Sequence, residues 1–185
     1  MNSLFIKKMT QTTTTILDDF FARMSKQSIS AYEDGDVKPI NLIPTTSGTL
    51  YLGSITSLQS IQELKIDYVV SLCERETHEE LFKDIEETYY DIEDQYDTVN
   101  KNKMISILDV EVPKILAYLQ KGKTVLVHCF AGISRSATVV IEIMSKHLDI
   151  DIISATSYVQ SHRDVICPNW CFLSLIHQRY VERHT

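Results

Sequence analysis

Along most of this 185-residue chain, short apolar runs alternate with segments whose apolar residues recur at helical spacing. Apolar and β-branched runs, typical of strands, lie at 40–43, 49–52, 66–72, 88–92 and 124–127. Apolar residues at helical spacing predict helices over about 55–64, 79–86, 104–119, 135–148, 152–162 and 170–183. Because strands alternate with helices, the pattern predicts an α/β fold: a single domain with a central, mostly parallel sheet flanked by helices on both faces.

Residues 1–38 stand apart from this pattern as an N-terminal extension, and residues 39–185 form the predicted globular domain. Five apolar residues of the extension follow helical spacing and predict an amphipathic helix: Ile16, Leu17, Phe20, Phe21 and Met24. We expect this stripe to pack on the domain, the alternative being a helix that docks a partner. The Thr12–Thr15 run favours a mobile segment, although β-branched residues also suit an edge strand.

Composition and charge exclude several classes of protein. The formal net charge is −7 and no basic block is present, so we expect no nucleic-acid partner. No apolar run reaches the roughly 18 residues that span a bilayer, and the run at Leu4–Ile6 is too short for a signal peptide, so we expect no membrane partner. Four scattered cysteines do not make a disulfide scaffold, which favours a reducing cytoplasmic or nuclear location.

Residues 128–136, His-Cys-Phe-Ala-Gly-Ile-Ser-Arg-Ser, carry the clearest chemistry. They follow the buried strand at 124–127, and Arg135 opens a helix, so the intervening loop lies at a helix N-terminus. Several backbone N–H groups converge at such a loop, and the helix dipole favours negative charge there. An anion and a thiolate both fit this environment. The pattern therefore predicts a phosphate site in which a cysteine sulfur attacks phosphorus.

Each residue of this loop has a predicted role. Cys129 is the nucleophile, and the loop amides and Arg135 favour its thiolate form. Arg135 is suited to grip two phosphate oxygens, and Ser136 to hydrogen-bond the sulfur. A merely buried structural cysteine is disfavoured, because Cys-x5-Arg with an internal glycine lies between a strand and a helix. The predicted phosphate-binding residues are Phe130, Ala131, Gly132, Ile133, Ser134 and Arg135.

Phosphoryl transfer to Cys129 expels an alkoxide or phenoxide, so a general acid is needed on the opposite side. The acidic loop at 91–97 contains three candidates, Asp91, Asp94 and Asp97. Asp91 lies within the predicted strand and is the least suitable, which leaves Asp94 and Asp97.

Other polar residues have plainer interpretations. His128 is expected to be a core histidine rather than a proton donor. The pair Cys167 and Cys171 lacks a second pair of ligands, so no metal site is expected. His162 and Arg163 are expected to cap a helix, the alternative being a secondary charge near the substrate.

The segment His128–Thr138 resembles the signature of the dual-specificity protein phosphatases, within the cysteine-dependent tyrosine phosphatase superfamily. Leu50–Ser54 is similar to the opening strand of that family, and Pro168-Asn169 followed by Phe172-Leu173 is similar to its final helix. The resemblance therefore extends over about residues 40–182 and implies a tyrosine-phosphatase-like fold.

This resemblance implies a metal-free and cofactor-free hydrolysis in two steps. Cys129 forms a phosphocysteine, Arg135 and the loop amides hold the phosphoryl oxygens, and Ser136 assists breakdown of the intermediate. An aspartate acts first as acid and then activates water. The family's spacing before the cysteine slightly favours Asp97, whereas the local sequence around 91–94 favours Asp94. The residues at 100–103 depart from the family's pattern and blur this register.

The loop composition bears on the substrate. Phe130, Ile133 and Ser134 are uncharged, whereas phosphoinositide-directed relatives tend to carry lysines here. The resemblance thus implies a small, atypical member whose partners are phosphorylated proteins, with both phosphotyrosine and phosphoserine/threonine accepted. The alternative is a catalytically weak or silent module that binds phosphoproteins.

Ser71–Arg75 resembles a segment of a lipid-phosphatase relative whose cysteine forms a disulfide with the nucleophile. The resemblance implies that Cys73 is a redox partner of Cys129 and protects it from irreversible oxidation. The alternative is a small buried residue at the end of a strand.

Overall fold

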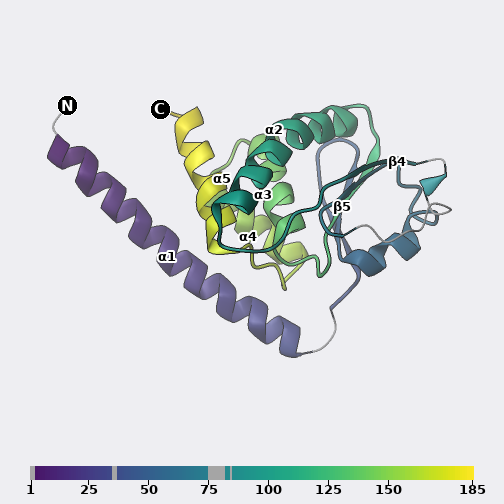
Figure 1. Cartoon of the computed structure of the whole chain (residues 1–185), viewed down its shortest axis with the longest axis horizontal. Coiled ribbons are helices and arrows are strands. Elements are labelled where there is room, and N and C mark those ends of the chain that lie inside the picture. Colours follow the sequence, from purple (N-terminus) through teal and green to yellow (C-terminus); the bar gives the residue numbers. More distant parts are fainter. Residues whose placement is uncertain (1–2, 35–36, 75–81, 84) are drawn as a thin grey trace.

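The structure is a computed structural model of the chain (Figure 1). It describes residues 3–34, 37–74, 82–83 and 85–185. A long N-terminal helix lies beside an α/β body, in which a sheet is covered by a layer of helices (Figure 1). Among the described residues, no helix combines the length and apolar character needed to cross a membrane.

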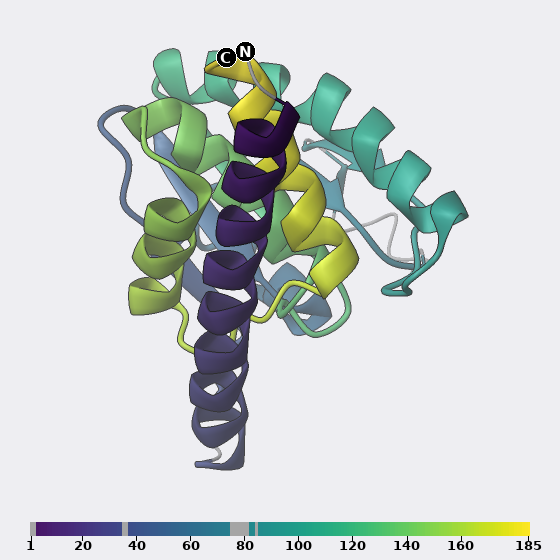
Figure 2. The same ribbon diagram turned by 90° about the vertical axis from the view of Figure 1, so that its left-hand side faces the viewer.

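Helix α1 (Ser3–Glu33) passes in front of the C-terminal helix α5 (Trp170–Arg183) in Figure 2, and Phe21 of α1 packs edge to face on Trp170 at the start of α5. Leu17, Phe20 and Met24 are buried in the main core, so the predicted packing of the apolar stripe on the domain is confirmed. Ile16, from the same stripe, remains 52% exposed. The Thr12–Thr15 run lies inside the helix, so the edge-strand alternative is wrong.

The sheet has five strands in the order β1-β2-β5-β3-β4. Their bounds are β1 Ile40–Ile43, β2 Thr49–Gly53, β3 Tyr68–Ser71, β4 Glu86–Tyr89 and β5 Thr124–His128. Only the β1–β2 pair is antiparallel among these strands, which confirms the predicted mostly parallel sheet. Strand β5 is central and lies between β2 and β3, which explains its continuous apolar run.

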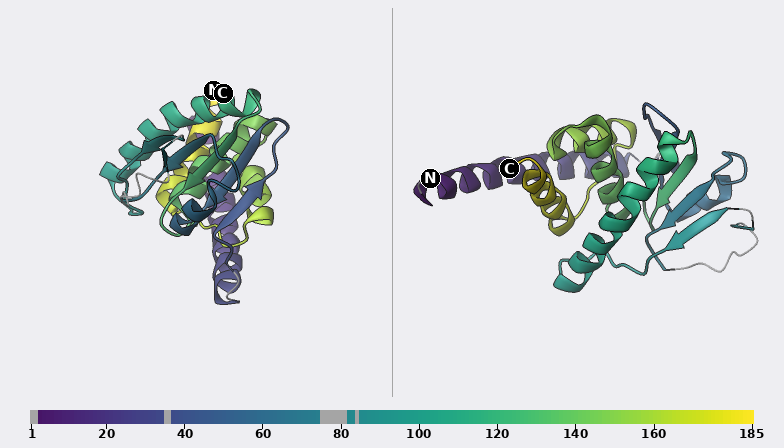
Figure 3. Two further views of the ribbon diagram at one scale, coloured as in Figure 1. Left: turned by 90° about the vertical axis from the view of Figure 1, so that its right-hand side faces the viewer. Right: turned by 90° about the horizontal axis from the view of Figure 1, so that it is seen from above.

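The two faces of the sheet are covered unequally (Figure 3, right). The four helices α2 (Thr98–Gln120), α3 (Arg135–Leu148), α4 (Ile152–His162) and α5 belong to the main core, which contains Val125 and Val127 of β5. Leu126 points the other way, into a smaller cluster with Leu58 of the 3-10 helix η1 (Ile55–Ser60). Alternate side chains of one strand thus contribute to both layers.

Two predicted elements need correction. The apolar stripe at 55–64 forms the short 3-10 helix η1 and turns instead of an α-helix. Half of the helix predicted at 79–86, residues 79–81 and 84, lies outside the described residues. Of the other half, Phe82, Lys83 and Ile85 are not α-helical, and Glu86 begins β4. Pairing explains the shift, because β4 aligns Glu86 with Tyr68 and Tyr89 with Ser71 of β3.

Candidate active site

The predicted phosphate loop lies at the carboxyl end of the central strand, where open parallel sheets bind their ligands. Cys129 follows the last residue of β5, and Arg135 is the first residue of α3. The amide of Cys129 donates to the carbonyl of Gly53 at the end of β2 (3.3 Å). The Cys129 residue is only 1% exposed, so its sulfur lies at the bottom of the loop.

The carbonyl oxygens of four successive loop residues are bonded from outside the loop. The four hydrogen bonds run from Ile55 N to Phe130 O (3.1 Å), from Arg163 Nη2 to Ala131 O (3.2 Å), from Arg163 Nε to Gly132 O (2.8 Å) and from Cys167 N to Ile133 O (2.9 Å). In a trans peptide, the C=O of one residue and the N–H of the next point in opposite directions. The amides of residues 131–134 are therefore turned toward the inside of the loop, and we call this arrangement, which is suited to binding an anion, the cradle.

The cradle already holds the cysteine sulfur. Gly132 N donates to Cys129 Sγ at 3.2 Å, and Ser136 Oγ donates to the same atom at 3.1 Å. Gly132 has φ +69°, and a Cβ at this position would lie 2.6 Å from Gly53 O and 2.7 Å from Arg163 Nη2. Only glycine combines this conformation with this close approach. The structure thus brings together Cys129, Gly132 and Ser136 as the sequence predicted.

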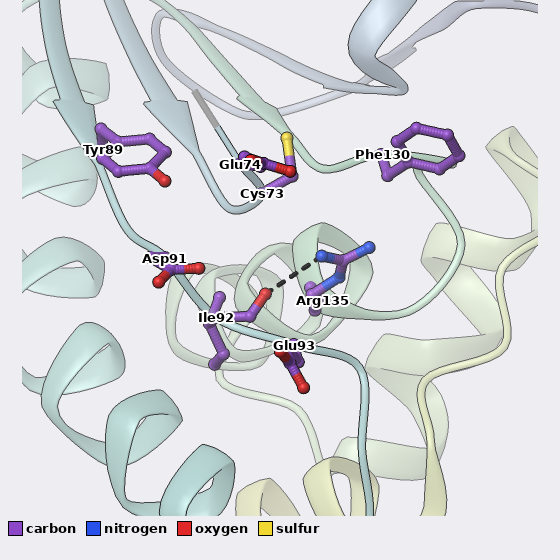
Figure 4. A pocket seen from close by; sticks show the side chains of 8 residues that line it. All are labelled: Cys73, Glu74, Tyr89, Asp91, Ile92, Glu93, Phe130 and Arg135. Atoms are coloured by element: carbon purple, nitrogen blue, oxygen red, sulfur yellow. Dashed lines mark hydrogen bonds between the residues drawn. The ribbon is translucent and has the colours of Figure 1, made fainter. Parts of the chain in front are cut away.

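Arg135 opens onto a pocket of about 540 Å³ beside the loop (Figure 4). The pocket is lined by Cys73, Glu74, Tyr89, Asp91, Ile92, Glu93, Phe130 and Arg135. Arg135 Nη1 donates to the carbonyl of Ile92 (3.0 Å), so the guanidinium joins the cysteine loop to the acidic loop. Phe130 is 66% exposed and lies across the pocket from Tyr89 (Figure 4).

Asp94 contacts the cysteine loop directly. Its Oδ1 accepts from Ser134 Oγ (2.7 Å) and from Asn169 Nδ2 (2.5 Å). Asn169 is the N-cap of α5, and its backbone N–H donates to Ser134 Oγ (2.9 Å). The three side chains thereby fasten the acidic loop, the cysteine loop and the start of α5 together.

Asp97 has a different position. It is the N-cap of α2, where its Oδ1 accepts from Asn100 N and its Oδ2 from Asn100 Nδ2, both at 2.7 Å. These two hydrogen bonds lower the pKa of Asp97, with the backbone amide of Asn100 as the larger cause. A carboxyl group with a lowered pKa is a poorer proton donor near neutral pH.

His128 is buried at the end of β5, as expected of a core histidine. Its Nε2 lies 2.7 Å from Ser71 Oγ, which in turn donates to Glu87 Oε1 (2.9 Å). Burial lowers the pKa of His128 to about 4, so its ring is neutral at physiological pH. The histidine packs beneath the loop without adding charge to it.

Arg163 is the residue whose role the sequence did not reveal. Its backbone caps α4, as predicted, through an N–H bond to Val159 O (2.9 Å). Its side chain turns inward, however, and is 2% exposed. There it bonds the carbonyls of Ala131 and Gly132. No local sequence signal distinguishes this arginine from an exposed helix cap.

A mostly parallel α/β sheet with a Cys-x5-Arg loop at its carboxyl edge defines a class of cysteine-containing, phosphate-binding proteins. A family model described as "Dual specificity phosphatase, catalytic domain" matches residues 50–181. This chain therefore belongs to the dual specificity phosphatase family.

Curated relatives agree with this assignment. Dual specificity protein phosphatase 19 of Mus musculus is 28% identical over 165 residues, covering 80% of this chain and 75% of the relative. Dual specificity protein phosphatase MPK-4 of Drosophila melanogaster is 27% identical over 147 residues, covering 77% of this chain. The chain spans only 37% of the length of MPK-4 and 10% of that of human dual specificity protein phosphatase 16.

Solved structures show the same fold. The crystal structure of human DUSP28 has a TM-score of 0.67 at 22% identity, covering 80% of this chain and 95% of the other. A mouse putative dual specificity phosphatase complexed with zinc tungstate has a TM-score of 0.64 at 21% identity, covering 78% of this chain and 87% of the other. At these identities the likeness concerns the fold.

Proposed function

We propose that this chain is a protein phosphatase that hydrolyses phosphotyrosine and phosphoserine/threonine through a phosphocysteine on Cys129. The observation that carries the proposal is the buried sulfur held by Gly132 N and Ser136 Oγ in a loop whose carbonyls point outward. The sulfur attacks phosphorus and the bond from phosphorus to the ester oxygen breaks, while the loop amides and Arg135 stabilise the equatorial oxygens. Water then cleaves the phosphocysteine, and Ser136 donates to the departing thiolate.

A catalytically silent phosphoprotein-binding module is not favoured. Such a module needs only the cradle, whereas this chain also retains the nucleophile and the residues around it. Cys129, Arg135 and Ser136 are all present, and Ser136 Oγ donates a hydrogen bond to Cys129 Sγ.

We assign the general acid to Asp94. Its carboxylate lies over the cysteine loop, 2.7 Å from Ser134 Oγ, and the loop that carries it is held to Arg135 through Ile92. The competing candidate, Asp97, uses both oxygens to hold Asn100 at the start of α2. Asp94 would donate a proton to the leaving oxygen and then accept one from the attacking water.

Asp94→Asn is expected to lower kcat on a phosphothreonyl peptide by about 100-fold, because an alkoxide leaves poorly without a proton donor. The same variant should lose much less activity on p-nitrophenyl phosphate, whose leaving group needs little protonation. Asp97→Asn is the matched control, since asparagine is also a good N-cap, and its activity should stay within about threefold of the unaltered protein. The opposite pattern would assign the acid to Asp97.

Charge around the pocket indicates the kind of phosphoprotein that fits. Glu74, Asp91 and Glu93 line the same pocket as Arg135, while Phe130 of the loop is uncharged (Figure 4). These carboxylates repel additional negative charge on a substrate and attract cations. We therefore propose substrates in which Lys or Arg flanks the phosphorylated residue, in preference to polyanionic inositol lipids.

Assays in the presence of a chelator test both the activity and this preference. Phosphotyrosyl and phosphothreonyl peptides with basic flanks should be hydrolysed with a kcat/KM about tenfold above that of matched peptides with acidic flanks. The difference should shrink as salt is added, because these charges are exposed. Failure to hydrolyse any phosphopeptide would overturn the proposed function, and faster hydrolysis of a phosphoinositide would overturn the substrate class.

We also propose that Cys73 is the redox partner of Cys129. Ser71 and His128 pair at the ends of β3 and β5, and Leu72 N donates to His128 O (3.0 Å). Cys129 directly follows β5 and Cys73 lies two residues after β3, so the two cysteines come from neighbouring strand ends. Peroxide would oxidise the Cys129 thiolate to a sulfenic acid, from which the Cys73 thiol displaces water to form a disulfide. Peroxide-treated protein should yield a Cys73–Cys129 peptide by mass spectrometry, and Cys73→Ser should inactivate irreversibly at lower peroxide concentration. The absence of that peptide would exclude this role.

A further inference from the structure

Arg163 is a buried cation held by neutral acceptors. Its guanidinium donates to Gly132 O (Nε, 2.8 Å), Ala131 O (Nη2, 3.2 Å), Lys38 O (Nη1, 2.7 Å) and Asn41 Oδ1 (Nη1, 2.6 Å). The residue is only 2% exposed. Burial of a charge is costly unless the surrounding polar groups compensate for it, so this arrangement needs a reason.

The hydrogen bonds of Arg163 determine the orientation of two peptide planes in the cysteine loop. Because the carbonyls of Ala131 and Gly132 bond outward to the guanidinium, the amides of Gly132 and Ile133 are turned inward. The bond from Gly132 N to Cys129 Sγ is the direct result of this orientation. The planar fork reaches both carbonyls at once, which a lysine ammonium does not reproduce.

The segment that follows Arg163 continues the support. Cys167 N bonds the next carbonyl, that of Ile133 (2.9 Å), so residues 163–167 hold three successive carbonyls of the loop. Helix α1 packs behind this segment, where Ser28 Oγ donates to Val165 O (2.6 Å). Helix α1 lies outside residues 50–181, which the family model matches, yet it packs against the segment that supports the cysteine loop.

The positive charge of Arg163 also acts on the cysteine loop. Burial lowers the pKa of Arg163, while the negative charges of Cys129 and Asp164 raise it. The buried guanidinium also places a positive charge beside the loop, which favours an anion such as phosphate bound there.

We propose that Arg163 is a positioning residue for phosphoryl transfer: it holds the carbonyls of Ala131 and Gly132 so that the amides of Gly132 and Ile133 converge on the sulfur and the phosphate, without touching the substrate itself. This role rests on the proposed phosphatase function. It makes Arg163 a second essential arginine beside Arg135, acting from the outer side of the loop.

The test compares Arg163→Met and Arg163→Lys with Arg179→Met. Arg179 is a suitable control because it is a partly buried arginine that joins α5 to Glu142 of α3, away from the loop. Arg163→Met is expected to lower kcat/KM on p-nitrophenyl phosphate by about 100-fold and to weaken inhibition by vanadate in parallel, as loss of an oriented oxyanion donor does. Arg163→Lys should recover less than about a tenth of the lost activity, because it restores the charge and not the fork. Arg179→Met should change neither kcat/KM nor vanadate inhibition by more than about threefold.

A folded Arg163→Met protein, with a cooperative thermal transition no lower than that of Arg179→Met and unchanged vanadate inhibition, would overturn the positioning role. If that variant does not fold, Asn41→Ala provides the second measurement, because it removes only one acceptor of Nη1. It should lower kcat/KM about threefold to tenfold with a matching loss of vanadate inhibition, and unchanged values would overturn the proposal. Inactivity of the unaltered protein in the same series would instead overturn the proposed function.

Discussion

Replacing Cys129 with serine is expected to lower kcat by about 10⁵-fold on phosphopeptides and aryl phosphates alike, as loss of a nucleophile does in other covalent enzymes. Serine keeps a hydroxyl in place of the sulfur but is far less ionised, and His128, the adjacent histidine, directs its Nε2 to Ser71 rather than to the nucleophile. The cradle should survive, because a serine oxygen is able to accept the bonds that Gly132 N and Ser136 Oγ now donate to Sγ.

Two measurements complete this test. The dissociation constant for phosphate or vanadate, measured by calorimetry, should stay within about tenfold of that of the unaltered protein, since the loop amides and Arg135 remain. Cys171→Ser is the matched control, because Cys171 lies on α5, and it should retain full activity. Turnover by Cys129→Ser above about 1% of the original rate would contradict a phosphocysteine mechanism.

Replacing Arg135 with lysine is expected to lower kcat/KM by about 10³-fold, the scale on which arginines assist other phosphoryl transfers. Lysine keeps the charge but loses the planar fork that grips two phosphoryl oxygens. It also loses the geometry of the Nη1 bond to Ile92 O, which joins the cysteine loop to the loop carrying Asp94. The defect should therefore appear in kcat as well as in KM.

Arg183→Lys is the control for this substitution. Arg183 bonds the buried Glu142 from the C-terminal end of α5, so a small loss of stability without loss of activity is expected there. Arg135→Lys activity within about tenfold of the original would show that the guanidinium is not the main phosphate-binding group.

The local chemistry of the cysteine loop is readable in the sequence because its parts are contiguous. Strand, loop and helix follow one another over residues 124–148, so the end of β5 and the start of α3 necessarily meet at Cys129 and Arg135. The alternation of apolar and helical segments likewise predicts the mostly parallel sheet that the structure shows. Boundaries were less predictable where pairing with a distant strand decided them, as at Glu86, which begins β4 through its register with Tyr68 of β3.

What the sequence alone determined is thus the α/β class, the central strand and the thiol, guanidinium and amides of one continuous loop. The tertiary structure decided which groups reach that loop from elsewhere. Asp94 and Asp97 are three positions apart and chemically identical, yet one bonds Ser134 while the other caps its own helix. Arg163 donates to the carbonyls of Gly132 and Ala131, which are 31 and 32 positions away in the sequence, and to that of Lys38, which is 125 positions away. Such contacts depend on how the layers pack, and periodicity along the chain carries no record of that packing.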